Sequence, residues 1–124
     1  MWLFTPLGFY SVVNNAMPGK KGVLIRARNR YHLERLCYNL EFNHLRIKET
    51  PLNDYRFRIE ATFKEFKRVM NILAEMPMDY TNFKGECSEQ AGYGLLDSAY
   101  VSALSKVWHT MYDYQHNNPE YKGK

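Results

Sequence analysis

The sequence predicts an α+β fold, because strand-like and helix-like patterns alternate along its 124 residues. Arginine alternates with apolar residues in two stretches, residues 24–29 and 55–60. Successive side chains of a strand point to opposite faces of a sheet, so each stretch predicts one buried row and one basic row. Apolar residues recur at helical spacing in three other stretches, residues 30–40, 62–76 and 95–115. Together these patterns favour a sheet covered by helices.

The first expected element is a strand over residues 3–13, which is apolar and aromatic and bulged near Pro6 and Gly8. A turn follows at residues 16–22, and a second strand runs over residues 23–28. A connection this short predicts an antiparallel hairpin.

A helix is expected next, over residues 30–40, where four apolar residues fall at helical spacing: Leu33, Leu36, Cys37 and Leu40. Residues 45–50 alternate weakly and predict a short third strand. Pro51 and the polar residues after it signal a turn. That turn leads into a fourth strand over residues 55–61.

Thr62 and Glu65 form a capping-box pattern, which predicts the start of a helix. This helix carries an apolar stripe and ends before Pro77. Residues 78–94 show an irregular pattern. A long helix then runs over about residues 95–115, with Tyr100, Leu104, Val107, Trp108 and Met111 on one face.

The predicted order is ββαββα with an added C-terminal helix. The first strand supplies the strand that a ferredoxin-like βαββαβ sandwich otherwise has at its end, so we expect a circularly permuted ferredoxin-like fold. Two helices would cover the sheet face made by Val23, Ile25, Ala27, Phe57 and Ile59. The arginine rows would lie on the opposite face. We expect a single α+β domain over residues 1–118 and a flexible tail over residues 119–124.

The charge of the chain is unevenly distributed around its net value of +4. Residues 20–68 hold 13 Lys and Arg against 6 Asp and Glu, whereas residues 69–118 hold 2 against 6. Such asymmetry suits an external polyanion, but it also suits attraction between the two parts of the chain.

Cys37 and Cys87 have no metal-binding spacing, so we expect two free thiols and a cytoplasmic location. We expect no signal peptide and no membrane-spanning segment. No cofactor, metal ligand or catalytic motif is predicted, and we expect a protein that is not an enzyme.

The arginine face is the first candidate site. Arg26, Arg28, Arg56 and Arg58 would project from it, joined by Arg46 or Lys48 and by Phe9 or Tyr10. Cations beside aromatic rings are what single-stranded RNA or DNA binding requires. A solvated face is the simpler alternative. A third possibility is that the C-terminal helix covers the face through acidic residues, namely Glu86, Glu89, Asp97 or Asp113; that helix could instead form a homodimer interface.

A second candidate site is a corner where a strand end meets a helix start. Arg26, Arg28, Arg30, His32 and Arg35 cluster there, which favours a small anionic ligand. The alternative is that the arginines are solvated and His32 is an ordinary surface residue. Further along the chain, residues 79–84 are expected to form a turn whose polar groups bond to one another. We expect Trp108 in the core and His109 at its edge.

Several segments resemble a group of short bacterial proteins of similar length, described only as hypothetical. The resemblance is carried by a beginning of the form MWxFTxxGFYSVV and by residues 26–28, 32–34, 54–56, 79–84 and 107–112. It spans nearly the whole chain and implies no activity, ligand or catalytic residue.

The function expected from these features is a small cytoplasmic binding or regulatory domain that is non-catalytic and dimeric. One alternative is single-stranded RNA or DNA binding on the arginine face. The other is an anion site or an enzyme at the corner of Arg28, Arg30 and His32.

Overall fold

The computed structural model describes residues 1–118 and residue 120. The chain divides into two units, Met1–Met78 and Asp79–Lys124, which are described separately below. The predicted single domain over residues 1–118 therefore stays a prediction. Of the predicted flexible tail, every residue but Glu120 lies outside the described residues.

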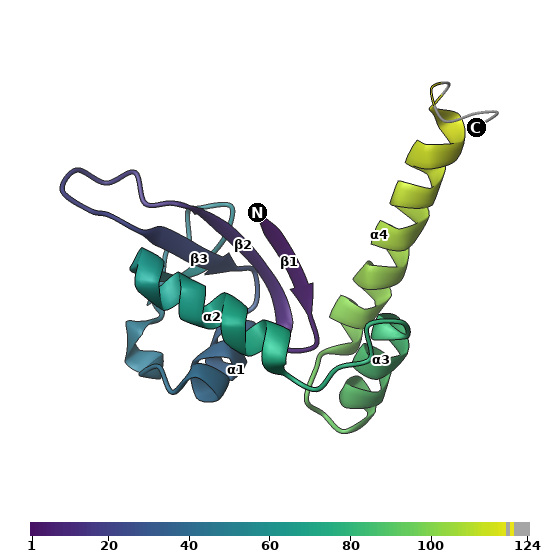
Figure 1. Cartoon of the computed structure of the whole chain (residues 1–124), viewed down its shortest axis with the longest axis horizontal. Helices are drawn as coiled ribbons and strands as arrows, with labels where there is room; N and C mark the ends of the chain where they lie inside the picture. Colours follow the sequence, from purple (N-terminus) through teal and green to yellow (C-terminus); the bar gives the residue numbers. More distant parts are fainter. Residues whose placement is uncertain (119, 121–124) are drawn as a thin grey trace. The chain divides into compact units, whose positions relative to one another are not determined.

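The first unit contains a five-stranded sheet in which all neighbouring strands are antiparallel (Figure 1). Its order is β1-β2-β3-β5-β4. The strands are β1 (Trp2–Thr5), β2 (Gly8–Asn14), β3 (Val23–Ala27), β4 (Lys48–Glu49) and β5 (Phe57–Ala61). The predicted hairpin between the second and third of these strands is present, since β2 pairs with β3 from Ser11 to Asn14.

The first predicted strand is in fact two strands joined by a tight turn. The Thr5 hydroxyl donates to the carbonyl of Gly8 at 2.9 Å and accepts from the amides of Leu7 and Gly8. Gly8 takes a φ of 149°, which L-residues rarely adopt. The chain therefore reverses at Pro6 and Leu7, and β1 pairs back onto β2.

The predicted third strand is wrong over its first half. A short 3₁₀ helix, η1 (His44–Arg46), replaces it, and β4 has only two residues. The Asn43 side chain accepts from the amide of Leu45, which starts this helical turn. Such local bonds from an asparagine compete with strand formation.

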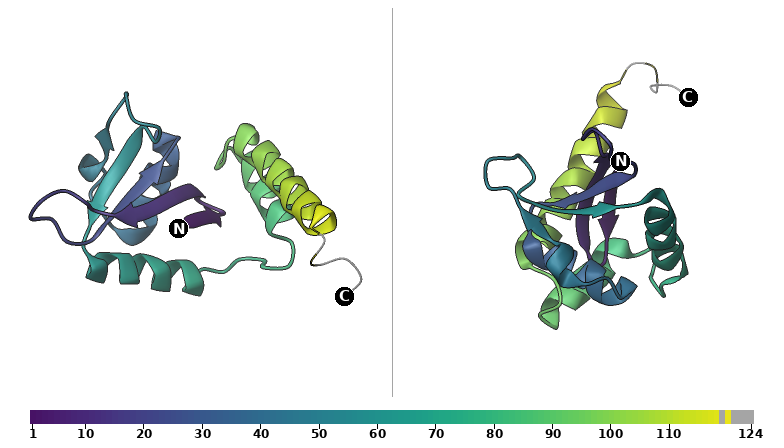
Figure 2. Two further views of the ribbon diagram at one scale, coloured as in Figure 1. Left: turned by 90° about the horizontal axis from the view of Figure 1, so that it is seen from above. Right: turned by 90° about the vertical axis from the view of Figure 1, so that its left-hand side faces the viewer.

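Two helices cover one face of the sheet. Helix α1 (Arg30–Leu40) has the predicted bounds, and α2 (Phe63–Glu75) begins at the predicted capping box of Thr62 and Glu65. Figure 2 shows both helices beside the sheet. Their buried residues join the inner sheet residues in one core, which includes Val12, Ile25, Ile59, Leu33, Leu36, Leu40, Val69 and Leu73. The other face of the sheet carries the arginines.

The second unit is a pair of helices, α3 (Phe83–Gly92) and α4 (Ser98–Asn117), which pack on each other. Helix α3 occupies a stretch expected to be irregular, so that expectation was wrong. Its sequence has almost no amphipathic pattern, since Cys87 is its one buried residue. On the α4 side of the unit the buried residues are Leu96, Tyr100 and Leu104. Within the described part of the chain, neither these helices nor those of the first unit could cross a bilayer.

Candidate functional site

The strand register places two of the predicted arginines side by side. Arg26 on β3 is the partner of Arg58 on β5, and on its other side it is the partner of Ser11 on β2. Directly opposed residues of neighbouring strands have Cβ atoms about 5 Å apart and on the same face. The row continues to Trp2 on one side and Lys48 on the other. The side chains of Arg26 and Arg58 thus start from neighbouring positions on the sheet face opposite α1 and α2.

Neither of these two guanidinium groups pairs with a carboxylate among the described residues. Arg26 donates to the hydroxyl of Ser11 at 2.7 Å, and Arg58 donates to the carbonyl of Tyr55 at 3.1 Å. The Nε atom of Arg58 is buried and has no hydrogen-bond partner. A guanidinium carries five N–H donors, so both side chains keep donors for an external acceptor.

The buried side chain of Tyr55 contacts two arginines of this face. Its ring lies 4.4 Å from the guanidinium carbon of Arg26 and 4.2 Å from that of Arg28. These cation–π contacts hold both arginines in place over a ring that is 6% exposed. Sequence reasoning assigned Tyr55 only to an alternating strand, and its position next to a turn gave no sign of this role.

Aromatic rings from β1 and β2 lie on the same face as Arg26. The Phe9 ring stacks on Phe4 with centroids 4.6 Å apart, and it meets Trp2 edge-on at 6.1 Å. The Phe9 and Tyr55 centroids are 6.3 Å apart, which links the rings to the arginines. Trp2 is 68% exposed. We call this set the arginine–aromatic face; its members are Trp2, Phe4, Phe9, Arg26, Tyr55 and Arg58.

Of the two aromatic residues proposed for this face, the structure selects Phe9. The hydroxyl of Tyr10 donates to the carbonyl of His32 at 2.7 Å, which places Tyr10 on the helix side.

Nothing among the family models, the curated proteins or the solved structures matches this chain. Function is therefore inferred from the arginine–aromatic face itself.

The other predicted cations near this face are paired. Arg28 donates to the carboxylate of Asp54 at 3.3 Å, and this hydrogen bond raises the pKa of the guanidinium. Arg56 lies 2.7 Å from a carboxylate oxygen of Glu49. Of the four predicted arginines, then, Arg26 and Arg58 are the two without an ion pair among the described residues.

The second candidate site, the strand–helix corner, consists of groups that already have partners. Arg30 pairs with Glu34 at 3.0 Å, and Arg35 donates to the carbonyl of Pro6 at 2.8 Å. His32 is 5% exposed, and its Nδ1 accepts from the amide of Phe9 at 3.2 Å. These pairings do not favour an anion site here, which stays a prediction.

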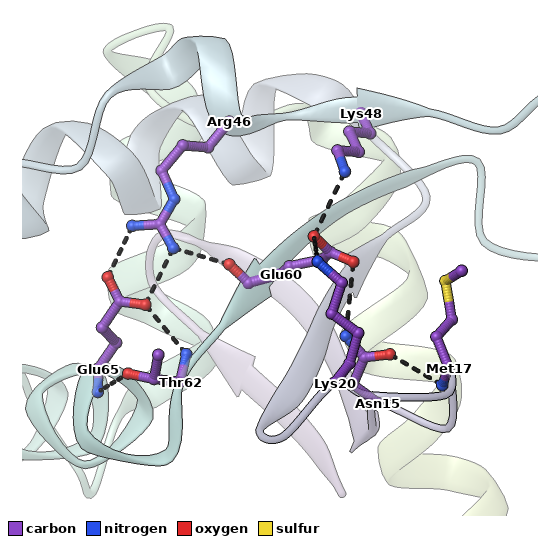
Figure 3. A network of polar contacts seen from close by, with 8 residues as sticks. All are labelled: Asn15, Met17, Lys20, Arg46, Lys48, Glu60, Thr62 and Glu65. Atoms are coloured by element: carbon purple, nitrogen blue, oxygen red, sulfur yellow. Dashed lines mark hydrogen bonds and ion pairs between the residues drawn. The ribbon is translucent and has the colours of Figure 1, made fainter.

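Arg46 belongs to a separate network on the helix side (Figure 3). Its guanidinium contacts both carboxylate oxygens of Glu65, at 2.8 and 3.0 Å, and donates to the carbonyl of Glu60 at 2.7 Å. Glu65 also accepts from the amide of Thr62 at 2.9 Å. The bond from Arg46, followed by that from Thr62, lowers the pKa of Glu65 to about 2. Arg46 is thus a structural cation, and the prediction that it joins the arginine face is not supported.

Lys48 also has a partner, as Figure 3 shows. Its Nζ lies 3.3 Å from a carboxylate oxygen of Glu60, which is also 3.8 Å from Nζ of Lys20. The hydrogen bond from Lys48 and the charge of Lys20 lower the pKa of Glu60. The Glu60 carboxylate therefore pairs with Lys20 and Lys48 and does not pair with Arg58.

A hollow of about 670 Å³ lies at the C-terminal end of α1 and opens to solvent. Its lining includes Glu34, Cys37, Glu41 and His44. Burial raises the pKa of the Cys37 thiol, which disfavours the thiolate that a nucleophile requires. No group of three metal-binding side chains is found in the described part of the chain.

Two smaller expectations concern the second unit. The amide of Asn82 donates to the carboxylate of Asp79 at 2.8 Å, and the amide of Asp79 donates to Glu86 at 2.7 Å. The expected local bonds are thus present at residues 79–82, whereas residues 83 and 84 belong to α3. Trp108 is 49% exposed, and its predicted place in the core was wrong. Nζ of Lys84 on α3 lies 5.0 Å from the centroid of the Trp108 ring, and this contact leaves half of the residue exposed.

Proposed function

We propose that this protein is a non-catalytic module that binds single-stranded nucleic acid on its arginine–aromatic face. The observation that carries the proposal is the cross-strand pair Arg26 and Arg58, which have no carboxylate partner among the described residues and lie beside a cluster of aromatic rings.

Phosphate is the group that the arginine pair fits. Guanidinium groups bind phosphate oxygens through two parallel N–H bonds, and these charge-assisted bonds are stronger than neutral ones. Two guanidinium groups held side by side repel each other, and an anion between them removes that repulsion.

The neighbouring rings supply the second half of single-strand recognition. Bases that are not paired stack on aromatic side chains, and each stacked base contributes about 1–3 kcal/mol. Trp2 offers the most exposed ring, while Phe4 and Phe9 support it from the same face. A duplex hides its bases and could not use these rings, so a single strand is favoured.

The charge of the first unit supports the same proposal. Residues 1–78 hold 13 Lys and Arg against 7 Asp and Glu. A net positive charge raises the encounter rate with a polyanion and makes binding sensitive to salt.

The finer fold assignment also stays a proposal. The order β2-β3-β5-β4 with antiparallel neighbours corresponds to a ferredoxin-like sheet whose last strand has moved to the front of the chain, with β1 added at one edge. Such a sheet leaves one face free of helices. Cys37 is a free and buried thiol, which supports a reducing compartment, and we propose the cytoplasm.

The test is fluorescence anisotropy with labelled single-stranded RNA and DNA 12-mers over a series of salt concentrations. Arg26→Ala and Trp2→Ala should each weaken binding about tenfold, as loss of a phosphate contact or a stacked base implies. The slope of log K against log salt should fall by about 0.7 for Arg26→Ala and stay unchanged for Trp2→Ala.

Arg56→Ala is the matched control, because it removes the same charge near the same sheet from a residue already paired with Glu49. It should change affinity less than threefold. Absence of binding at low salt would overturn the proposal, and so would equal losses from Arg26→Ala and Arg56→Ala, which would show attraction by net charge alone.

A further inference from the structure

Helix α4 continues beyond the helix that covers it. Helix α3 has ten residues and α4 has twenty, or about 15 Å and 30 Å of helix. The Nζ atom of Lys84, near the start of α3, lies 5.0 Å from the Trp108 ring centroid. Trp108 thus marks the end of the covered part of α4, and about two and a half turns follow it.

The uncovered part carries the same apolar stripe as the covered part. At 100° per residue, Val107, Trp108 and Met111 fall on the same face of α4 as the buried Tyr100 and Leu104. Tyr100 and Leu104 are buried, whereas Val107, Trp108 and Met111 are 37%, 49% and 57% exposed. The exposed stripe therefore continues the buried side of α4.

We infer that a second copy of this chain covers this stripe, so that the exposed halves of two α4 helices pair about a two-fold axis. No residue of α4 in the stripe is charged, since Lys106 and Asp113 lie on the opposite side of the helix, and Lys84 of α3 contacts the stripe only at Trp108. Two copies of an uncharged apolar surface can meet without repulsion between like charges.

The available area is close to the lower limit for such a pairing. Aromatic side chains bury about 150–250 Å² each. Trp108 in the stripe and Tyr112 and Tyr114 on its two flanks are each about half exposed, and together they leave about 300 Å² uncovered. With Val107 and Met111 from both copies, the apolar contact approaches the roughly 1,000 Å² of a specific interface. This inference is independent of nucleic-acid binding.

The test is the mass of the full chain by sedimentation equilibrium between about 1 and 200 µM. The wild-type chain should reach twice its 14.7 kDa. Met111→Glu and Met111→Lys should both remain monomeric at concentrations where the wild type is dimeric, because an apolar contact excludes either charge. Met111 is exposed, so circular dichroism should show unchanged helix content.

Ser102→Glu is the control, since it places a charge on the opposite face of the same helix and should leave the dimer intact. A wild-type chain that stays monomeric at 200 µM would refute the inference. Dimers that persist in both Met111 variants would also refute it, by showing that another surface joins the copies.

Discussion

At the scale of single residues, the structure depends on one close approach between β2 and α1. Gly8 has a φ of 149°, and a Cβ atom added there would lie 2.3 Å from Cγ of His32. His32 in turn accepts from the amide of Phe9, a member of the arginine–aromatic face. Because glycine has no side chain, the His32 ring can pack against Gly8 and accept the hydrogen bond from Phe9 at the start of β2.

Replacing this glycine should be costly. We expect Gly8→Ala to lower the free energy of unfolding by about 2–4 kcal/mol, because the strained φ and the clash with the His32 ring add. Urea denaturation measures the change. Gly92→Ala is the control, since a Cβ there meets nothing within 4 Å, and it should be neutral or slightly stabilising. Equal stability of both variants would contradict the assigned contact.

At the scale of elements, Glu65 connects three parts of the first unit. It completes the capping box of α2, pairs with Arg46 of η1 and, through Arg46, reaches the carbonyl of Glu60 on β5. A folded-state pKa of about 2 lies below the usual value of 4.5. The stabilisation from this carboxylate is thus complete above about pH 4.5 and is lost as the pH falls through about 2.

Glu65→Gln tests this assignment. At pH 7 the free energy of unfolding of the variant should be about 1–2 kcal/mol lower than that of the wild type, as expected for a capping and charge-assisted contact on a partly exposed carboxylate. The difference from wild type should shrink between pH 4.5 and 2 in urea denaturation curves. Glu75→Gln, an exposed residue of the same helix, should show no such difference. If the difference in unfolding free energy between wild type and Glu65→Gln stayed constant with pH, the Glu65 charge would not be what stabilises the fold here.

At the scale of the whole molecule, the chain has two units with separate cores. Every residue of the main core cluster lies between Leu7 and Leu73, inside the first unit. The sheet, α1, α2 and all six members of the arginine–aromatic face belong to that unit. Stability and the proposed binding surface should therefore not depend on α3 and α4.

We expect a fragment of residues 1–78 to fold alone and to unfold cooperatively, since it retains its whole core. Near-ultraviolet circular dichroism and urea denaturation provide the measurement. The fragment should also bind the labelled oligonucleotides within about threefold of the full chain. A fragment without cooperative unfolding would instead support the single domain predicted over residues 1–118.

The amino-acid sequence by itself determined the α+β class, both helices of the first unit and the capping box at Thr62, because these follow from local periodicity and from bonds within one helical turn. Only the tertiary structure decided which arginines of the alternating stretches are available. Arg28 pairs with Asp54, 26 residues further along the chain, and Arg56 pairs with Glu49 across the turn between β4 and β5. Arg26 and Arg58 instead become cross-strand neighbours. These pairings depend on strand register and loop path, which alternation along one strand does not encode.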